Sequence, residues 1–263
     1  MKKIIIGNWK MNPLSLQEGE SLFINIAKSA SLIKNTEIVI CPPFLYLPSF
    51  VSILAGKGKP KFPNLHKKIS LGAQNVFWGE GGAFTGEVSA EMLYNIGVRY
   101  VILGHSERRA LGETNALVNK KIKASLSAGL RPILCVGEST RDENHNYFNL
   151  VKTQLEECLN GVKKTLIPKV IIAYEPIWAI STTENRKDAT PADSLEMVIF
   201  IRKILSDKFG SDAGGMRIVY GGSVNEKNAP EFFKNGGIDG LLPGRASLDI
   251  ARFIKIIKIA ENA

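Results

Sequence analysis

Eight short and largely apolar segments recur along the chain, and they constrain the fold more than any other feature. Each is followed by a polar or glycine-containing turn. A strand with one wet face alternates apolar and polar residues, whereas a strand of a buried parallel sheet is rich in Val, Ile and Leu throughout. The segments therefore predict eight parallel strands, at residues 3–6, 37–41, 69–73, 100–103, 132–135, 170–174, 217–220 and 240–242.

Segments with helical spacing lie between the predicted strands, at residues 115–128 and 192–209, and after the last strand, at residues 249–260. The first follows Thr114, a residue type that caps helix N-termini, and stops before Gly129. Alternating strands and helices are typical of an α/β protein with a parallel sheet. Eight repeats favour one closed (β/α)8 barrel, a TIM barrel, over all 263 residues. No G-x-G-x-x-G motif follows the first strand, which disfavours an open dinucleotide-binding sheet.

Composition narrows the class of protein further. A chain of 263 residues with 44% hydrophobic content can bury a core without disulfides or metal. The three cysteines are far apart and lack metal-ligand spacing, which predicts reduced thiols in a cytoplasmic protein. The first apolar run stops at Gly7, too early for a secretory signal, and no stretch approaches the about 20 apolar residues of a membrane span.

The formal net charge of +9 is compatible with two functions. A basic surface can bind nucleic acid, or it can attract an anionic metabolite. Five lysines fall within residues 57–68, a Pro- and Lys-rich stretch without hydrophobic periodicity. We interpret this basic insertion, residues 56–68, as a solvated surface loop, and we expect neither nucleic-acid nor membrane binding.

In a closed barrel of parallel strands, the chemistry lies on the loops that follow the strands. Five of these loops carry distinctive groups: a lysine (Lys10), an imidazole (His105), a carboxylate (Glu175) and two small-residue turns around Ser223 and Gly244. Turns with exposed N–H groups suit a phosphate. A carboxylate beside a neutral acid suits removal of a proton next to a carbonyl. Taken singly, each residue is more often structural than catalytic.

Longer motifs surround these groups, at residues 7–12, 41–44, 72–76, 82–87, 104–109, 173–180 and 220–224. With these motifs in this order at matching strand ends, the chain resembles the triosephosphate isomerase family over essentially its whole length. The resemblance implies a cofactor-free and metal-free enzyme of glycolysis and gluconeogenesis. Such an enzyme interconverts dihydroxyacetone phosphate and D-glyceraldehyde 3-phosphate through an enediolate.

The resemblance also implies roles for individual residues. Glu175 would take the proton from the substrate carbon, and His105 would polarise the carbonyl. Lys10 and Asn8 would stabilise the enediolate, with Glu107 close behind Lys10. A short helix starting after His105 would favour its uncharged ring, because helix N-termini disfavour cations.

Phosphate binding and assembly follow from the same resemblance. The implied substrate- and phosphate-binding residues are Asn8, Lys10, Ser181, Ser223, Gly244 and Arg245. The loop from Gln74 to Glu87 would insert into a second subunit of a homodimer. The interface candidates are Gln74, Thr85, Glu87 and Arg108.

Two departures from the family pattern leave alternatives open. The lid, residues 176–191, is three residues longer than usual, and Ser181 and Thr183 stand where glycines are expected. Because glycine has the widest backbone freedom, we expect a lid that closes with altered kinetics. Arg245 replaces a glycine: either its side chain turns outward, or its guanidinium adds charge near the phosphate. A phosphometabolite-binding barrel with reduced or lost isomerase activity is therefore the alternative, although Asn8, Lys10, His105 and Glu175 are all retained.

Overall fold

A computed structural model describes residues 1–56, 68–180 and 188–263 of the chain. Eight parallel strands form a closed barrel in which each strand pairs with its neighbours in the sequence and β1 pairs with β8. This confirms the fold class predicted from the eight apolar segments. The strands are β1 (Lys3–Asn8), β2 (Thr36–Cys41), β3 (Ile69–Ala73), β4 (Tyr100–Leu103), β5 (Arg131–Val136), β6 (Ile171–Tyr174), β7 (Arg217–Tyr220) and β8 (Gly240–Leu241).

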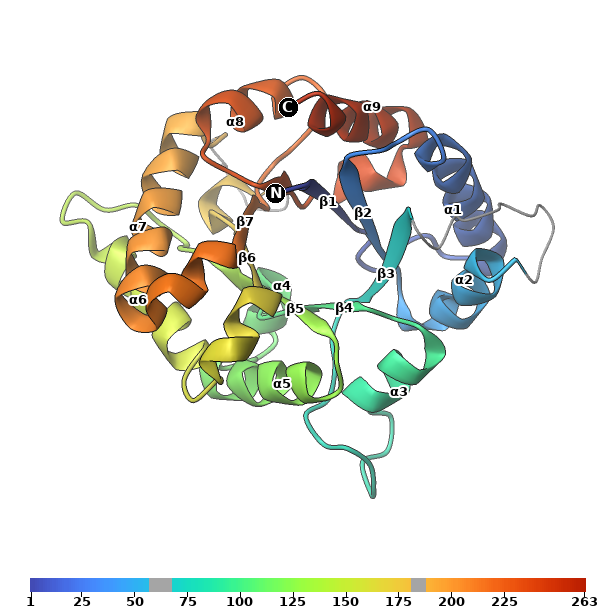
Figure 1. Cartoon of the computed structure of the whole chain (residues 1–263), viewed down its shortest axis with the longest axis horizontal. Helices are drawn as coiled ribbons and strands as arrows, with labels where there is room; N and C mark the ends of the chain where they lie inside the picture. The colour runs from blue at the N-terminus through green and yellow to red at the C-terminus, as the bar shows by residue number, and fades with distance from the viewer. Residues whose placement is uncertain (57–67, 181–187) are drawn as a thin grey trace.

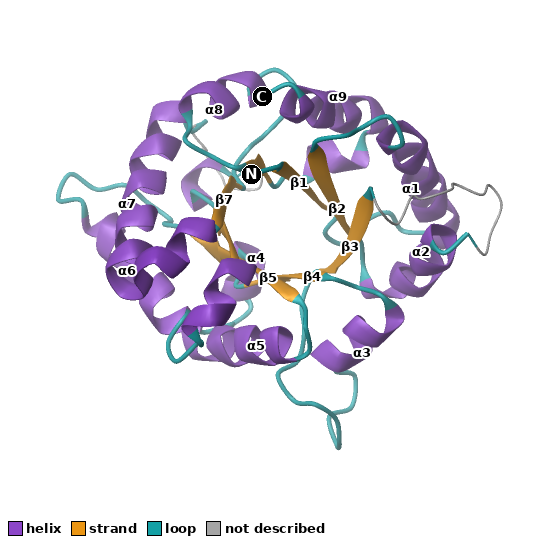
Figure 2. Cartoon of the chain, viewed as in Figure 1, coloured by secondary structure: helices purple, strands orange, loops and turns teal. Residues whose placement is uncertain are grey.

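Helices surround the barrel as an outer ring (Figures 1 and 2). The α-helices are α1 (Leu16–Ala30), α2 (Leu47–Leu54), α3 (Ala90–Ile96), α4 (Ser106–Ala110), α5 (Asn115–Ser127), α6 (Asn146–Cys158), α7 (Pro191–Phe209), α8 (Ala229–Asn235) and α9 (Ile250–Glu261). Short 3-10 helices are η1 (Phe44–Tyr46), η3 (Lys164–Lys169), η4 (Ile177–Ala179), η5 (Gly210–Gly215) and η6 (Arg245–Leu248). The predicted cap holds, since the Thr114 hydroxyl accepts a hydrogen bond from the Leu117 N–H at 3.3 Å.

Two apolar layers explain why the strands lack an alternating pattern. In β1, Ile5 belongs to the layer between barrel and helices, whereas Ile4 and Ile6 belong to the layer inside the barrel. Both layers exclude water, so both faces of each strand are apolar. The parallel register brings the carboxyl ends of all strands to one rim, where the predicted site residues lie.

The opposite rim carries an ionic cluster. The Glu37 carboxylate accepts hydrogen bonds from Tyr100 and from Arg217, the latter at 2.6 Å. Burial alone would raise the pKa of Glu37, but the Tyr100 hydrogen bond and the charge of Arg217 outweigh it and hold this pKa below its usual value. This rim is therefore an ionised, pH-sensitive part of the fold.

Candidate active site

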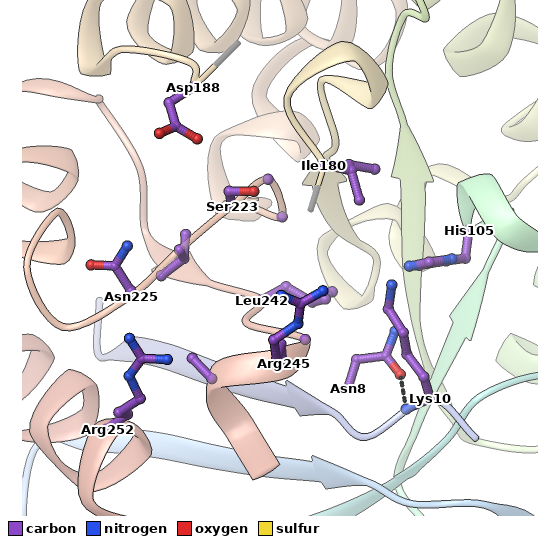
Figure 3. A pocket seen from close by; sticks show the side chains of 15 residues that line it. Asn8, Lys10, His105, Ile180, Asp188, Ser223, Asn225, Leu242, Arg245 and Arg252 are labelled. Atoms are coloured by element: carbon purple, nitrogen blue, oxygen red, sulfur yellow. Dashed lines mark hydrogen bonds between the residues drawn. The ribbon is translucent and has the colours of Figure 1, made fainter. Parts of the chain in front are cut away.

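A cavity of about 170 Å³ opens at the carboxyl rim of the barrel. We call it the rim pocket; Figure 3 shows its lining side chains. Among the predicted site residues, six line it: Asn8, Lys10, His105, Ser223, Gly244 and Arg245. The predicted phosphate ligand Ser181 and the central lid residues, 181–187, lie outside the described residues, as does most of the basic insertion.

Lys10 is fixed from three directions. Its ammonium lies 2.5 Å from Glu107 Oε1, as expected for these two residues. Its N–H donates to Asn8 Oδ1 at 3.0 Å, and its carbonyl accepts a hydrogen bond from Gln74 Nε2 at 2.8 Å. The backbone of Lys10 has a φ of +53°, an uncommon conformation for a residue with a side chain. Gln74, predicted at a subunit interface, therefore also holds Lys10 in place within its own chain.

The short helix predicted after His105 is α4, and the His105 side chain caps it. Its Nδ1 accepts a hydrogen bond from the Glu107 N–H at 3.2 Å. A ring nitrogen that accepts a hydrogen bond carries no proton, so the proton of the neutral ring is on Nε2. Nε2 lies 3.4 Å from Glu175 Oε1.

Glu175 follows β6 and is only 2% exposed. Its Oε2 accepts a hydrogen bond from the Ser106 N–H at 3.3 Å, and its own N–H donates to the Val136 carbonyl at 2.8 Å. A Cβ placed on Gly137 would lie 1.9 Å from the Glu175 carbonyl oxygen. A glycine at position 137 is thus what lets the Glu175 backbone approach β5 so closely.

Cys135 lies beside Glu175 in a small cavity that Gly104 and Ser106 also line. The thiol is buried, and its burial raises its pKa well above the usual value. A protonated, buried thiol is a poor nucleophile, so Cys135 is a packing residue of the barrel.

A buried ion pair supports the loop that carries His105. The Glu113 carboxylate accepts a hydrogen bond from the Gly104 N–H at 3.0 Å and pairs with the Lys121 ammonium. Lys121 also donates to Asn75 Oδ1 at 2.7 Å. Both charged side chains are at most 5% exposed. This pair joins the ends of β3 and β4 to α5, and neither residue was predicted as a site residue from the sequence.

A second carboxylate missed by the sequence analysis holds the base of the lid. Glu138 is fully buried, and its Oε1 accepts hydrogen bonds from the Tyr174 hydroxyl and from Trp178 Nε1, both at 2.8 Å. Arg141 Nε lies 3.2 Å from the same oxygen. Trp178 therefore donates a hydrogen bond at the base of the lid. The position of Glu138 just after β5 was the available signal, because every barrel strand ends at this rim.

The small-residue turns after β7 and β8 form the far end of the rim pocket. The Ser223 hydroxyl donates to the Ala179 carbonyl at 2.8 Å. Gly244 and Arg245 begin η6, and the Ser247 N–H binds the Gly244 carbonyl at 2.9 Å. Three polar residues that were not predicted from the sequence also line the pocket at this end: Asp188, Asn225 and Arg252 (Figure 3).

The remaining interface candidates lie outside the rim pocket. Thr85 and Glu87 are exposed, and Arg108 is half-buried. The segment between β3 and α3 projects away from the barrel (Figure 1), and its Phe84 is 50% exposed. An exposed aromatic side chain on a projecting loop suits a subunit contact, and the homodimer stays a prediction.

Within residues 1–56, 68–180 and 188–263, no cluster of three or more His, Cys, Asp or Glu side chains could hold a metal ion. None of the helices in the same three segments is long and apolar enough to cross a membrane.

Comparison with known proteins agrees with this geometry. The sequence profile of the family described as triosephosphate isomerase matches residues 3–260. The chain belongs to the triosephosphate isomerase family. It is 43% identical to the triosephosphate isomerase of Aquifex aeolicus, over 98% of this chain and 99% of that protein. It is 45% identical to the one of Dehalococcoides mccartyi, over 100% and 99% of the two chains.

The family is also evident in the backbone. The crystal structure of triosephosphate isomerase from Bartonella henselae superposes with a TM-score of 0.83 at 35% identity. The match covers 98% of this chain and 99% of that one. Family membership thus extends over the barrel and over the loops that build the rim pocket.

Proposed function

We propose that the chain is a triosephosphate isomerase that interconverts dihydroxyacetone phosphate and D-glyceraldehyde 3-phosphate. One observation carries the assignment: a buried carboxylate, a neutral imidazole and an ammonium group meet at one rim, on Glu175, His105 and Lys10. Glu107 links two of them, because it pairs with the Lys10 ammonium and its N–H donates to His105 Nδ1. The activity of the relatives supports the same reaction.

Glu175 is the base. It removes a proton from the substrate carbon next to the carbonyl and returns it to the neighbouring carbon. Its carboxylate accepts the Ser106 N–H in this structure and does not line the rim pocket, so it must turn away from that N–H to reach the substrate.

His105 and Lys10 stabilise the charge that forms on the substrate oxygen. The Nε2 proton of His105 is the donor available to that oxygen, because Nδ1 is occupied by the Glu107 N–H. The Lys10 ammonium supplies the positive charge, and Asn8 lines the same wall. Donors fixed before the reaction starts stabilise a developing oxyanion without reorganisation.

The phosphate is bound at the far end of the rim pocket by backbone N–H groups of Ser223, Gly244 and Arg245, with Ser181 added from the lid. The whole chain is one domain, and it acts as a homodimer in the cytoplasm. Analytical ultracentrifugation tests the dimer, and a monomer at micromolar concentration would count against the interface set Gln74, Thr85, Glu87 and Arg108.

The test of the reaction is isomerisation of D-glyceraldehyde 3-phosphate by the wild type and by Glu175→Gln. A positioned general base contributes about 10²–10⁴-fold, so the variant should lose activity by about that factor. Glu143→Gln, which changes an exposed glutamate, is the matched control and should keep wild-type activity. A folded wild type without activity would bring forward the phosphate-binding alternative, which no contact in the described residues favours.

A further inference from the structure

Among the described residues, three cationic side chains other than histidine line the rim pocket, and two of them are paired with a carboxylate of the protein. Lys10 is 2.5 Å from Glu107, and Arg252 Nε is 3.2 Å from Glu226 Oε2. The third is Arg245, for which the described part of the chain provides neither an ion pair nor a side-chain hydrogen bond. Within the described part of the chain, the guanidinium of Arg245 is therefore the pocket cation that has no carboxylate partner.

The backbone beneath Arg245 is held by the barrel itself. The Asn8 N–H donates to the Pro243 carbonyl at 3.1 Å, and the Leu242 N–H donates to the Tyr220 carbonyl at 2.8 Å. The Ser247 hydroxyl binds the Gly244 carbonyl at 2.6 Å. The backbone of Arg245 is thus held in place before a ligand binds, so little of the free energy of ligand binding would be lost in ordering the loop.

The side chain points into the pocket. Figure 3 shows the Arg245 guanidinium between Ser223 on one side and Lys10 on the other. Asp188, the carboxylate among the described lining residues, lies beyond Ser223 in the same view and has an interaction of its own. An anion seated between Ser223 and Lys10 would therefore lie beside this guanidinium.

We propose that Arg245 is a specificity-determining residue of the rim pocket, whose guanidinium binds the substrate phosphate together with the backbone N–H groups. This inference rests on the proposed function for the identity of the substrate. A guanidinium can give two parallel hydrogen bonds to phosphate oxygens, and such charge-assisted pairs are stronger than neutral ones. Of the two alternatives that the sequence left open for Arg245, this inference favours a guanidinium that adds charge at the phosphate over a side chain that turns outward.

The effect falls on binding and not on proton transfer. Arg245 contacts the end of the ligand that does not react, so it binds ground state and transition state alike. Uniform binding of this kind lowers KM and leaves kcat unchanged. The same contact strengthens the binding of inorganic phosphate, a competitive ligand that carries the charge and lacks the carbon chain.

The test compares wild type, Arg245→Ala and Arg245→Lys, with Lys203→Ala as the control for net charge. Lys203 lies on α7, is 72% exposed and is not a pocket residue. KM and kcat are measured for D-glyceraldehyde 3-phosphate, and the Kd of inorganic phosphate by isothermal titration calorimetry. Because Arg245 is exposed, its removal should leave the fold intact, which circular dichroism verifies.

In Arg245→Ala we expect both KM and the phosphate Kd to rise about tenfold, with kcat within about twofold of wild type. For Arg245→Lys, KM and the phosphate Kd should lie between those of the wild type and of Arg245→Ala, because lysine keeps the positive charge but cannot give the two parallel hydrogen bonds of a guanidinium. Lys203→Ala should match the wild type. Unchanged KM and phosphate Kd in Arg245→Ala, or a lower kcat at unchanged KM, would overturn the inference.

The calorimetric arm separates this inference from the proposed function. If the wild type does not isomerise the substrate but Arg245→Ala still weakens phosphate binding about tenfold, the reaction assignment fails and the phosphate contact stands. If the wild type is active and Arg245→Ala does not change the phosphate Kd, the reaction assignment stands and the proposed contact between Arg245 and the phosphate is refuted.

Discussion

The buried pair between Lys121 and Glu113 gives the sharpest test of the energetics of this fold. Changing Lys121 to Met keeps most of the side-chain volume but leaves the Glu113 carboxylate, at 3% exposure, without a counter-charge. Breaking a buried pair by removing one partner costs about 3–5 kcal/mol. Glu113→Gln should cost a similar amount, because it strands the ammonium, although its amide oxygen can still accept the Gly104 N–H.

The double variant distinguishes pairing from other effects. With both charges removed, no ion is left uncompensated, so Lys121→Met combined with Glu113→Gln should cost less than either single change. The coupling energy between the two positions should be about 3 kcal/mol or more. Urea unfolding at one fixed protein concentration measures all four forms, since the stability of an oligomer depends on concentration.

An exposed pair on α7 provides the comparison. Lys203 and Asp207 lie 3.1 Å apart, at 72% and 66% exposure. Lys203→Met should change the free energy of unfolding by less than about 1 kcal/mol, because water already screens the pair. If Lys121→Met cost no more than Lys203→Met, or if the two buried changes were simply additive, the reasoning from burial would be refuted.

Three further predictions follow from other parts of the structure. Because the pKa of Glu37 is lowered in the folded state, its contribution to stability is present above the usual pKa of 4.5 and is lost as the pH falls through the pKa of the folded protein. Glu37→Gln should therefore be less stable than the wild type at pH 7, but its Tm should fall less between pH 5 and about pH 3. An equal fall in Tm for the two proteins would contradict this. Gly137→Ala should lower both kcat and stability, because the added Cβ displaces the Glu175 backbone. Gly214→Ala is the control: a Cβ there meets nothing within 4 Å, so neither kcat nor stability should change. Burial shields all three thiols, Cys41, Cys135 and Cys158, and raises their pKa values. Ellman's reagent should therefore modify the native protein at least about a hundredfold more slowly than the urea-unfolded chain. Fast labelling of the native protein would show that one thiol is accessible.

Sequence periodicity predicted the barrel well because each strand is buried on both faces. The segments at residues 69–73, 100–103 and 217–220 match β3, β4 and β7 in both bounds, and the others differ by one or two residues at one or both ends. Strand ends are harder to place because the residues there are constrained by hydrogen bonds to neighbouring strands, and periodicity does not encode these partners. The resemblance supplied the roles at the rim, and the structure added their geometry.

The residues that the sequence analysis missed share a different property. Glu113, Glu138 and Arg252 act through partners on other elements, as when Glu138 accepts a hydrogen bond from Trp178, 40 residues away in the chain. A carboxylate after a strand looks the same in the sequence whether it faces water or a buried indole. Burial and pairing arise only when the barrel closes, so the roles of these three residues could be recognised only in the folded structure.

That closure has a consequence for how the protein is made. The first strand finds its last neighbour through only two residue pairs, Ile4 with Gly240 and Ile5 with Leu241. At about 5–20 residues per second, a ribosome needs about 10–50 s to reach that point, and until then the apolar edge of β1 has no strand beside it. Unpaired edges of this kind recruit other chains. We expect the yield of active protein to depend on how well the nascent chain is shielded during that interval, and codon changes that slow the last fifth of translation to lower it.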